Sequence, residues 1–306
     1  MSIEVTRNFH ALPETPLVPV RLNSDDVVIW CKLELLNPSG STKDRIASFI
    51  VAKACRQGRL RPGDCVIEAS SGSTSIAFAR VCAQTGLRFV AVMPDGVSNE
   101  RLLSIRAYGG EVITTPPEKG IQGALDKAAE EAERLGAFLP RQFSNPDNPE
   151  AHRLQTAQEN IRQSPDGRGD AIVSGVGTGG TLVGLYQGLV DHGCQVKPFA
   201  AKPTTGSALS DVECCSFSAR IPGIVECLSQ IYAEADLPNL VELEIEDDKA
   251  LDVARRLIRL GFPVGPSSGL NYAAAQAAAA QLEEDSRIVT VFPDRMERYF
   301  STELFV

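Results

Sequence analysis

The chain lacks the features that mark membrane proteins and proteins that bind nucleic acid through a broad basic surface. Its 306 residues carry a net charge of −9, whereas neutralising phosphates takes clustered Lys and Arg. No apolar run approaches the ~20 residues of a membrane helix. Residues 1–13 lack the basic start and apolar core of a signal peptide. We therefore expect no nucleic-acid partner, no membrane partner and a cytoplasmic location.

Cysteine and histidine are present without a metal-binding pattern. The chain has no CxxC pair and no zinc-ligand spacing, and several cysteines lie in apolar runs, as reduced buried thiols do. The vicinal pair Cys214–Cys215 is compatible with a redox feature and equally with two loop thiols. His10, His152 and His192 show no ligand spacing, so we give them structural roles and predict no metal.

Short β-rich runs alternate with longer helical patterns, which predicts α/β architecture with parallel sheets and helices on both faces. The Asn- and Pro-rich segment Gln142–Pro149 separates two such series, so we expect two α/β units that meet there. The expected strands are 27–34, 65–69, 89–93, 112–115, 171–176, 196–201, 241–245 and 288–292. The expected helices are 46–55, 74–84, 99–108, 120–134, 150–163, 181–191, 248–260 and 268–284.

Lys43 lies where a Ser- and Gly-rich loop, Asn37–Thr42, enters a helix. Ser41 and Asp44 resemble a capping box, which places Lys43 in the first helical turn. There the positive end of the helix dipole, aided by desolvation, favours a neutral amine. A neutral amine is the form that makes a Schiff base with a carbonyl compound. A solvated surface lysine is the alternative that this residue alone leaves open.

Gly177-Thr178-Gly179-Gly180-Thr181 follows a predicted strand and opens a helix, as anion-binding loops do. A P-loop is excluded because the motif has no Gly-Lys-Ser/Thr ending. Gly175, Gly177 and Gly180 also satisfy GxGxxG, but a dinucleotide site needs an acidic residue about 20 positions later, where this chain has Ala200-Ala201-Lys202. An unliganded turn is the remaining alternative.

Two further loops precede helices. Glu68–Ser75 offers hydroxyls and amides suited to a carboxylate, or it is a capped, solvated turn. Ser267-Ser268-Gly269 precedes an alanine-rich helix, where simple capping is the plain interpretation.

In this order the blocks resemble the fold-type II pyridoxal-phosphate (PLP) enzymes, and more narrowly the cysteine synthase family and its B branch. The resemblance spans nearly the whole chain and rests on several motifs together, which is more specific than any single glycine motif. The blocks are Pro13–Leu17, Asn37–Arg45, Glu68–Thr74, Gln142–Pro149, Gly177–Thr181, Ser267–Gly269, Asp294–Arg295 and Arg298–Thr302.

The resemblance implies two doubly wound parallel-sheet domains of the tryptophan synthase β type, with PLP in the interdomain cleft, and a homodimer. One domain would be 36–148, and the other 1–35 with 149–306. Lys43 would carry PLP, the loop Gly177–Thr181 would hold its phosphate, and Ser267 would bond its pyridine nitrogen. A neutral hydroxyl there disfavours long-lived quinonoids and suits β-elimination. The implied substrate contacts are Ser70, Ser71, Gly72, Thr74, Gln142 and Gly223.

One position departs from the family. Cysteine synthases usually have asparagine where this chain has Ser73, and that asparagine reaches the 3′ oxygen of PLP and the substrate. Ser73 would still contact the cofactor, but it offers one donor where an amide offers two. The substitution leaves the identity of the substrate open.

The implied reaction is β-replacement on an activated L-serine, O-acetylserine or O-phosphoserine, through an aminoacrylate, with sulfide as the standard nucleophile and L-cysteine as the product. Three alternatives stay open: an amine nucleophile, a serine/threonine dehydratase or β-eliminating lyase, and a non-catalytic scaffold. The absence of His after Gly72 disfavours the dehydratase, and Lys43 disfavours the scaffold.

Overall fold

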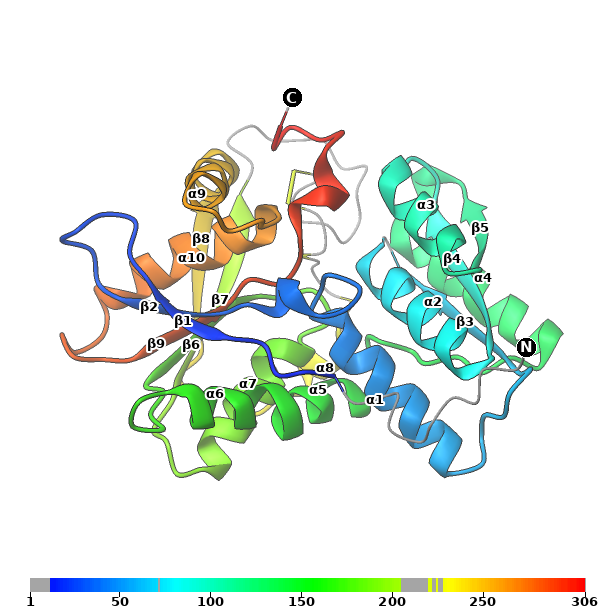
Figure 1. Ribbon diagram of the computed structural model, residues 1–306, viewed down its shortest axis with the longest axis horizontal. Coiled ribbons are helices and arrows are strands. Elements are labelled where there is room, and N and C mark those ends of the chain that lie inside the picture. Colours follow the sequence, from blue (N-terminus) through cyan, green and yellow to red (C-terminus); the bar gives the residue numbers. More distant parts are fainter. Residues whose placement is uncertain (1–11, 71, 205–219, 222–223, 225–227, 306) are drawn as a thin grey trace.

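The computed structural model describes residues 12–70, 72–204, 220–221, 224 and 228–305. In this part of the chain the strands form two sheets, of six and three strands. Figure 1 shows them in two lobes, with helix α1 (Lys43–Arg56) running between the lobes. The α/β class with parallel sheets is thus confirmed.

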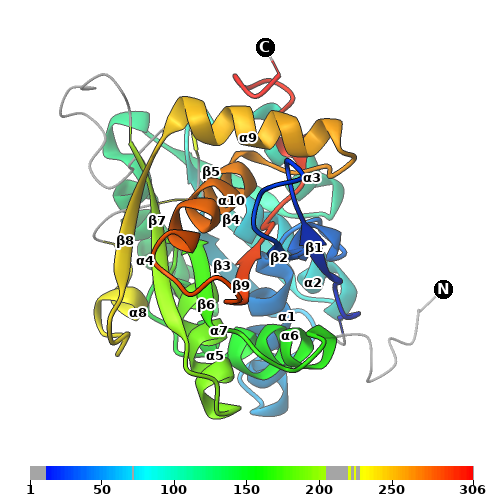
Figure 2. The ribbon, with the colours of Figure 1, turned by 90° about the vertical axis from the view of Figure 1, so that its left-hand side faces the viewer.

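The larger sheet has the strand order β1-β2-β9-β6-β7-β8. Every pairing is parallel except that of β1 with β2. Helices α9 and α10 cover one face and α6 and α7 the other (Figure 2). The strands are β1 (Leu17–Val20), β2 (Ile29–Lys32), β6 (Ala171–Gly175), β7 (Lys197–Thr204), β8 (Val241–Glu246) and β9 (Ile288–Val291). The helices are α6 (Ala157–Gln163), α7 (Gly180–Asp191), α9 (Asp247–Arg259) and α10 (Pro266–Ala279).

The smaller sheet is parallel, in the order β3-β4-β5, and has its own apolar clusters. Helix α1 packs on α2 on one side and on α5 on the other. The elements are β3 (Cys65–Ala69), β4 (Arg88–Pro94), β5 (Glu111–Thr115), α2 (Ser73–Thr85), α3 (Asn99–Ala107), α4 (Gly120–Leu135) and α5 (Asp147–Ala151). The separate sheets support a division near residues 36 and 148, which stays a prediction.

Several details differ from the sequence expectations. The expected helix 150–163 is α5 and α6 joined by a π-helical turn, His152–Thr156, and such turns are frequent at functional sites. Strand β1 was not expected, because Leu17–Val20 is short and contains Pro19. Short elements were also missed: α8 (Gln230–Ala233) and the 3-10 segments Glu34–Leu36, Pro117–Lys119 and Met296–Tyr299. No helix in the described ranges is long and apolar enough to cross a membrane.

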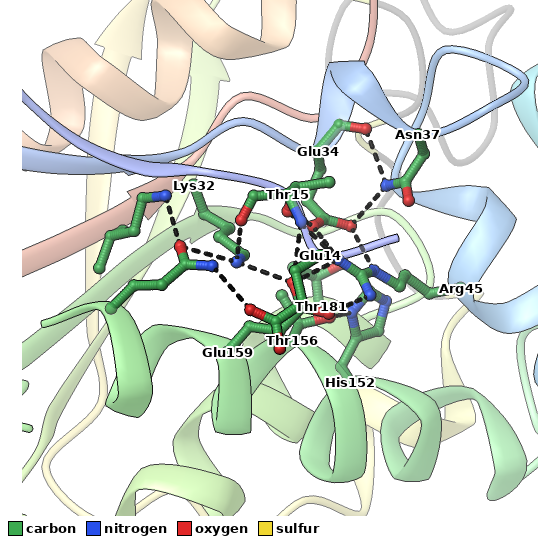
Figure 3. A network of polar contacts seen from close by, with 12 residues as sticks. Glu14, Thr15, Lys32, Glu34, Asn37, Arg45, His152, Thr156, Glu159 and Thr181 are labelled. Carbon is green, nitrogen blue, oxygen red and sulfur yellow. Dashed lines mark hydrogen bonds and ion pairs between the residues drawn. The ribbon is translucent and has the colours of Figure 1, made fainter. Parts of the chain in front are cut away.

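A buried ionic cluster fixes the position of α1 (Figure 3). The Arg45 guanidinium binds the carboxylates of Glu34 and Glu159 at 2.9 and 2.5 Å, and Lys32 binds Glu159 at 2.8 Å. All four side chains are at most 5% exposed. The Thr15 hydroxyl donates to Glu34 at 2.6 Å. The cluster thereby ties the helix that carries Lys43 to the N-terminal segment, to the residues before Asn37 and to α6.

Candidate active site

The loop before Lys43 is held by the chain segment that follows β9. The amide of Thr42 donates to the Pro293 carbonyl at 2.7 Å, and Ser41 pairs with Asp294 in an antiparallel bridge. The two Nη atoms of Arg298 donate to the carbonyls of Gly40 (2.8 Å) and Ser39. These contacts come from about 250 residues away in the chain, so sequence spacing alone gave no sign of them.

Lys43 is the first residue of α1, as predicted, but the capping is different. The Asp44 carboxylate receives the amide and the hydroxyl of Ser39 at 2.9 and 2.6 Å, and also Arg80 at 2.7 Å. The capping-box prediction was therefore wrong. Asp44 fastens the loop rather than its own helix end, and the N-cap is Thr42, without a side-chain cap hydrogen bond. The Ser41 hydroxyl accepts the Lys43 amide at 3.3 Å instead.

The surroundings of the Lys43 amine favour its neutral form. Burial lowers its pKa, the Asp294 carboxylate opposes that shift, and Arg298 adds to it. Within the described part of the chain, no hydrogen bond or ion pair engages the amine. A half-buried amine without an acceptor is unlike a solvated surface lysine and suits covalent attachment to a carbonyl group.

The hydroxyl of Ser70 organises the loop after β3. Ser70 is buried, and its hydroxyl accepts the amides of Gly72 (3.0 Å) and Ser75 (3.2 Å). A Cβ at Gly72 would lie 2.5 Å from Cδ of Arg101, so glycine lets the arginine on α3 pack against the loop. Ser71, Cys214–Cys215 and Gly223, which the sequence analysis named, lie outside the described residues.

Gln142 connects this loop to the predicted domain junction. Its Oε1 accepts the Thr74 hydroxyl at 2.7 Å, and its Nε2 donates to the Ala69 carbonyl at 2.7 Å. The Gln142 amide donates to the Glu68 carboxyl at 3.1 Å. The structure thus brings together Gln142 and Thr74, two residues that the resemblance implies as substrate contacts, with one Nε2 hydrogen of Gln142 left for another acceptor.

The Gly177–Thr181 loop has the features of an anion site. Within the described residues, no acceptor receives the five amides of this loop. Gly179 is left-handed (φ +76°), and α7 begins at Gly180. A Cβ at Gly180 would lie 1.8 Å from Oδ1 of Asn148. Nδ2 of Asn148 donates both to the Thr178 hydroxyl (2.9 Å) and to the Gln142 carbonyl (2.8 Å), which links this loop to Gln142.

His152 lies next to the Gly177–Thr181 loop, a position that the sequence did not predict. Its Nε2 lies 3.3 Å from the Thr181 hydroxyl, and its Nδ1 lies 2.9 Å from the Thr156 hydroxyl. Burial lowers the pKa of His152 to about 3, with Glu34 opposing, so the ring is neutral. Its spacing in the sequence matches no motif. The signal is the π-helical turn, which a helical pattern does not reveal.

Asp294 joins the loop after β3 to the block Arg298–Thr302 and to the residue before α10. Its Oδ2 accepts the Ser73 hydroxyl at 3.2 Å and the Tyr299 hydroxyl at 2.6 Å, and its carbonyl accepts the Gly265 amide at 2.9 Å. Ser267 follows Gly265 in the first turn of α10 and is 7% exposed. The neighbouring Ser268 is fully buried, and its hydroxyl has no partner among the described residues.

Comparison with known proteins fits this arrangement. The model of the family described as "Pyridoxal-phosphate dependent enzyme" matches residues 9–294. The chain belongs to this family. It is 38% identical to cysteine synthase of Staphylococcus aureus strain N315 over 95% of this chain and 94% of the relative. The relatives place this PLP-dependent enzyme in the cysteine synthase family, and its sheets match PLP fold type II.

Solved structures of PLP-family relatives superpose along almost the whole chain. O-ureido-L-serine synthase matches with 36% identity and a TM-score of 0.83, covering 95% of this chain and 92% of that one. An O-acetylserine-dependent cystathionine β-synthase from Helicobacter pylori matches with 31% identity and a TM-score of 0.87, covering 100% of both chains. A hydrogen sulfide-producing enzyme from Fusobacterium nucleatum matches with 33% identity and a TM-score of 0.83, covering 93% and 96%.

The residues of this PLP-family enzyme fit its cofactor. Lys43 offers an amine without a hydrogen-bond acceptor, and the Gly177–Thr181 loop offers amides without acceptors for a phosphate. Ser267 offers a neutral hydroxyl. Ser73 fits less well as a donor to the cofactor, because Asp294 receives its only hydroxyl proton.

Proposed function

We propose that the enzyme carries out β-replacement on an activated L-serine, with Lys43 as both the attachment point of PLP and the acid–base group. The observation that carries the proposal is the Lys43 amine, whose pKa is lowered by burial and which no described residue engages in a hydrogen bond or ion pair. The names of the relatives support the reaction class, since they include a cysteine synthase and an O-acetylserine-dependent synthase.

Each loop then has a defined task. The amides of Gly177–Thr181 bind the phosphate of PLP, and Ser267 faces the ring nitrogen. Bound PLP supplies an electron sink at the substrate Cα. Ser70, Gly72 and Thr74 with Gln142 bind the α-carboxylate, and Ser71 and Gly223 belong to the same predicted set. Lys43 takes the Cα proton while the β-substituent leaves with the electrons of its bond, and it returns a proton to Cα after addition.

Sulfide, giving L-cysteine, is the first candidate for the nucleophile, because a cysteine synthase is among the most similar relatives. A different nucleophile is the second candidate, because solved relatives of similar identity are named for O-ureido-L-serine and cystathionine synthesis. The Ser73–Asp294 hydrogen bond favours examining this second candidate.

Borohydride reduction of the purified enzyme, followed by peptide mapping, tests the central assignment. The pyridoxyl group should appear on Lys43, and Lys43→Ala should lose it. Lys53 on the same helix is the matched control, because its amine is held by Asp147. Lys53→Ala should keep the adduct on Lys43. An adduct on any other lysine would contradict the mechanism.

Acetate release from O-acetylserine, measured before any nucleophile is added, follows the elimination half of the reaction apart from the addition half. We expect acetate release in the wild type and its loss in Lys43→Ala.

We also propose that the enzyme is a homodimer and that its domains are residues 36–148 and residues 1–35 with 149–306. Light scattering tests the homodimer, and limited proteolysis tests the domain boundaries. A monomer in solution would contradict the first of these proposals.

A further inference from the structure

The Ser73 hydroxyl points its proton toward a carboxylate, although Ser73 lies in the loop that is proposed to bind the substrate. The only hydrogen that its side chain can donate goes to Oδ2 of Asp294, at 3.2 Å. The Ser73 side chain is half-buried rather than enclosed. Its oxygen therefore keeps lone pairs, and Ser73 presents an acceptor without a free donor, whereas the family's asparagine amide presents two N–H donors beside its acceptor oxygen.

Asp294 is placed to receive a proton. Its carboxyl group is 6% exposed, and Oδ1 has no hydrogen-bond partner among the described residues. Burial raises the pKa of the Tyr299 hydroxyl, so that hydroxyl remains a donor to Oδ2. The ionisable groups nearby are the Lys43 amine, Arg298 and Arg101, whose guanidinium lies 5.2 Å from the Tyr299 ring centroid.

We propose that Ser73 and Asp294 form a two-step proton relay that adapts this enzyme to a neutral nucleophile carrying an N–H or O–H bond. The inference rests on the proposed β-replacement. In this relay Ser73 contacts the nucleophile, and Asp294 is a positioning residue that acts through Ser73.

The relay accounts for the proton that the nucleophile must lose when it adds to Cβ. A neutral nitrogen nucleophile gives its lone pair to Cβ and becomes positively charged. Its N–H proton passes to Oγ of Ser73 while the Ser73 hydroxyl proton passes to Oδ2 of Asp294. Asp294 returns the proton to solvent before the next turnover. Hydrosulfide needs no such step, because the anion becomes a neutral thiol group when its electron pair forms the bond to Cβ.

Two nucleophiles measured on the same holoenzyme test the relay: 1,2,4-triazole, which must lose its N–H proton, and hydrosulfide. In Asp294→Asn the ratio of the triazole rate to the hydrosulfide rate should fall at least ~10-fold, since a positioned general base contributes ~10²-fold or more. Ser73→Ala should lower the ratio similarly. Ser73→Thr keeps a hydroxyl, so its ratio should be close to that of the wild type. Asp126→Asn on the exposed face of α4 is the matched control.

Visible absorbance of bound PLP and acetate release from O-acetylserine are measured for every variant. Equal losses with both nucleophiles would show that Asp294 only supports the fold and would overturn the relay. A wild type that releases acetate and uses hydrosulfide but not triazole would also overturn it, with β-replacement left intact. A wild type that releases no acetate would overturn the proposed function itself. If Asp294→Asn does not fold, the Ser73→Ala and Ser73→Thr pair decides.

Discussion

The Arg298 guanidinium donates to the Gly40 carbonyl at 2.8 Å, so the end of the chain holds the loop that precedes Lys43. We predict that Arg298→Gln weakens PLP binding about tenfold or more. The variant leaves the buried Gly40 carbonyl and the partly buried Ser39 carbonyl without their charged donor, which costs ~1–3 kcal/mol. Titration of the apoenzyme with PLP, followed by visible absorbance, measures the effect.

Arg255 supplies the matched control for this prediction. Its guanidinium also donates to two backbone carbonyls, of Glu303 at 2.7 Å and Leu304 at 3.2 Å, but away from the lysine loop. Arg255→Gln should leave PLP affinity unchanged. An equal loss in both variants would mean that Arg298 acts through general stability.

Gly180 has no room for a side chain, because a Cβ there would lie 1.8 Å from the Asn148 side-chain oxygen. We predict that Gly180→Ala displaces Asn148 from Thr178 and distorts the phosphate loop, with loss of most bound PLP. Gly58→Ala is the control: Gly58 has φ +69° and no atom within 4 Å of the added Cβ, so only backbone strain of ~1 kcal/mol is expected. Gly180→Ala with normal PLP content would contradict the assignment.

The sequence could predict the elements that follow a regular pattern. Strand β3 (Cys65–Ala69) has the bounds that its apolar run indicates, and α7 begins within one residue of the expected position. The Gly177–Thr181 loop was visible because strand, glycines and helix are consecutive in the chain.

The remaining parts depend on contacts between distant segments. Ser73 and Asp294 are 221 residues apart, and no local pattern indicates that one takes the proton of the other. The π-helical turn that brings His152 to Thr181 adds one residue to a helical turn without changing the apolar pattern of the segment. Geometry of this kind appears only when both partners are placed in space.

Ser267 and Ser268 should behave differently. We predict that Ser267→Ala keeps PLP but changes its absorption spectrum and slows turnover, because the proposed partner of the ring nitrogen is lost. Ser268→Ala should leave the spectrum nearly unchanged and raise the melting temperature slightly, since it removes a buried hydroxyl without a described partner. The reverse order in the spectra would assign the ring contact to Ser268.

Arg45 is the cation on which two buried carboxylates depend. We predict that Arg45→Met lowers the free energy of unfolding by ~3–5 kcal/mol, because Glu34 loses its cationic partner in the interior and Glu159 keeps only Lys32. Arg88→Met is the control, since Arg88 and Glu111 are 58% and 62% exposed and such pairs contribute ~0–1 kcal/mol. Urea denaturation measures both variants. Equal effects would contradict the assigned importance of the cluster.

The same cluster predicts acid sensitivity. Burial alone would raise the pKa of Glu34, but Arg45 lowers it to about 2 from an ordinary value of 4.5. A carboxyl with a depressed folded-state pKa stabilises the fold fully above the unfolded value and loses that contribution as the pH falls through the folded one. The wild type should therefore lose stability between about pH 4.5 and 2, and Arg45→Met should lose less in that interval.

Glu68 should produce the opposite pH dependence. Burial raises the pKa of its carboxyl from 4.5 to about 8, against the hydrogen bonds from the amides of Ala69, Gln142 and Arg141. The folded protein then holds a proton that the unfolded chain releases, so this contribution to stability is complete below about pH 4.5 and is lost as the pH rises through about 8. Glu68→Gln should remove that slope, which melting temperatures across this range would show.

The Glu68→Gln variant should also be ~1–3 kcal/mol less stable, because its side-chain NH₂ would face a backbone N–H whose hydrogen bond the carboxyl group now accepts. Glu283→Gln, at an exposed position, should keep the wild-type slope. A slope that survives in Glu68→Gln would assign the proton to another group.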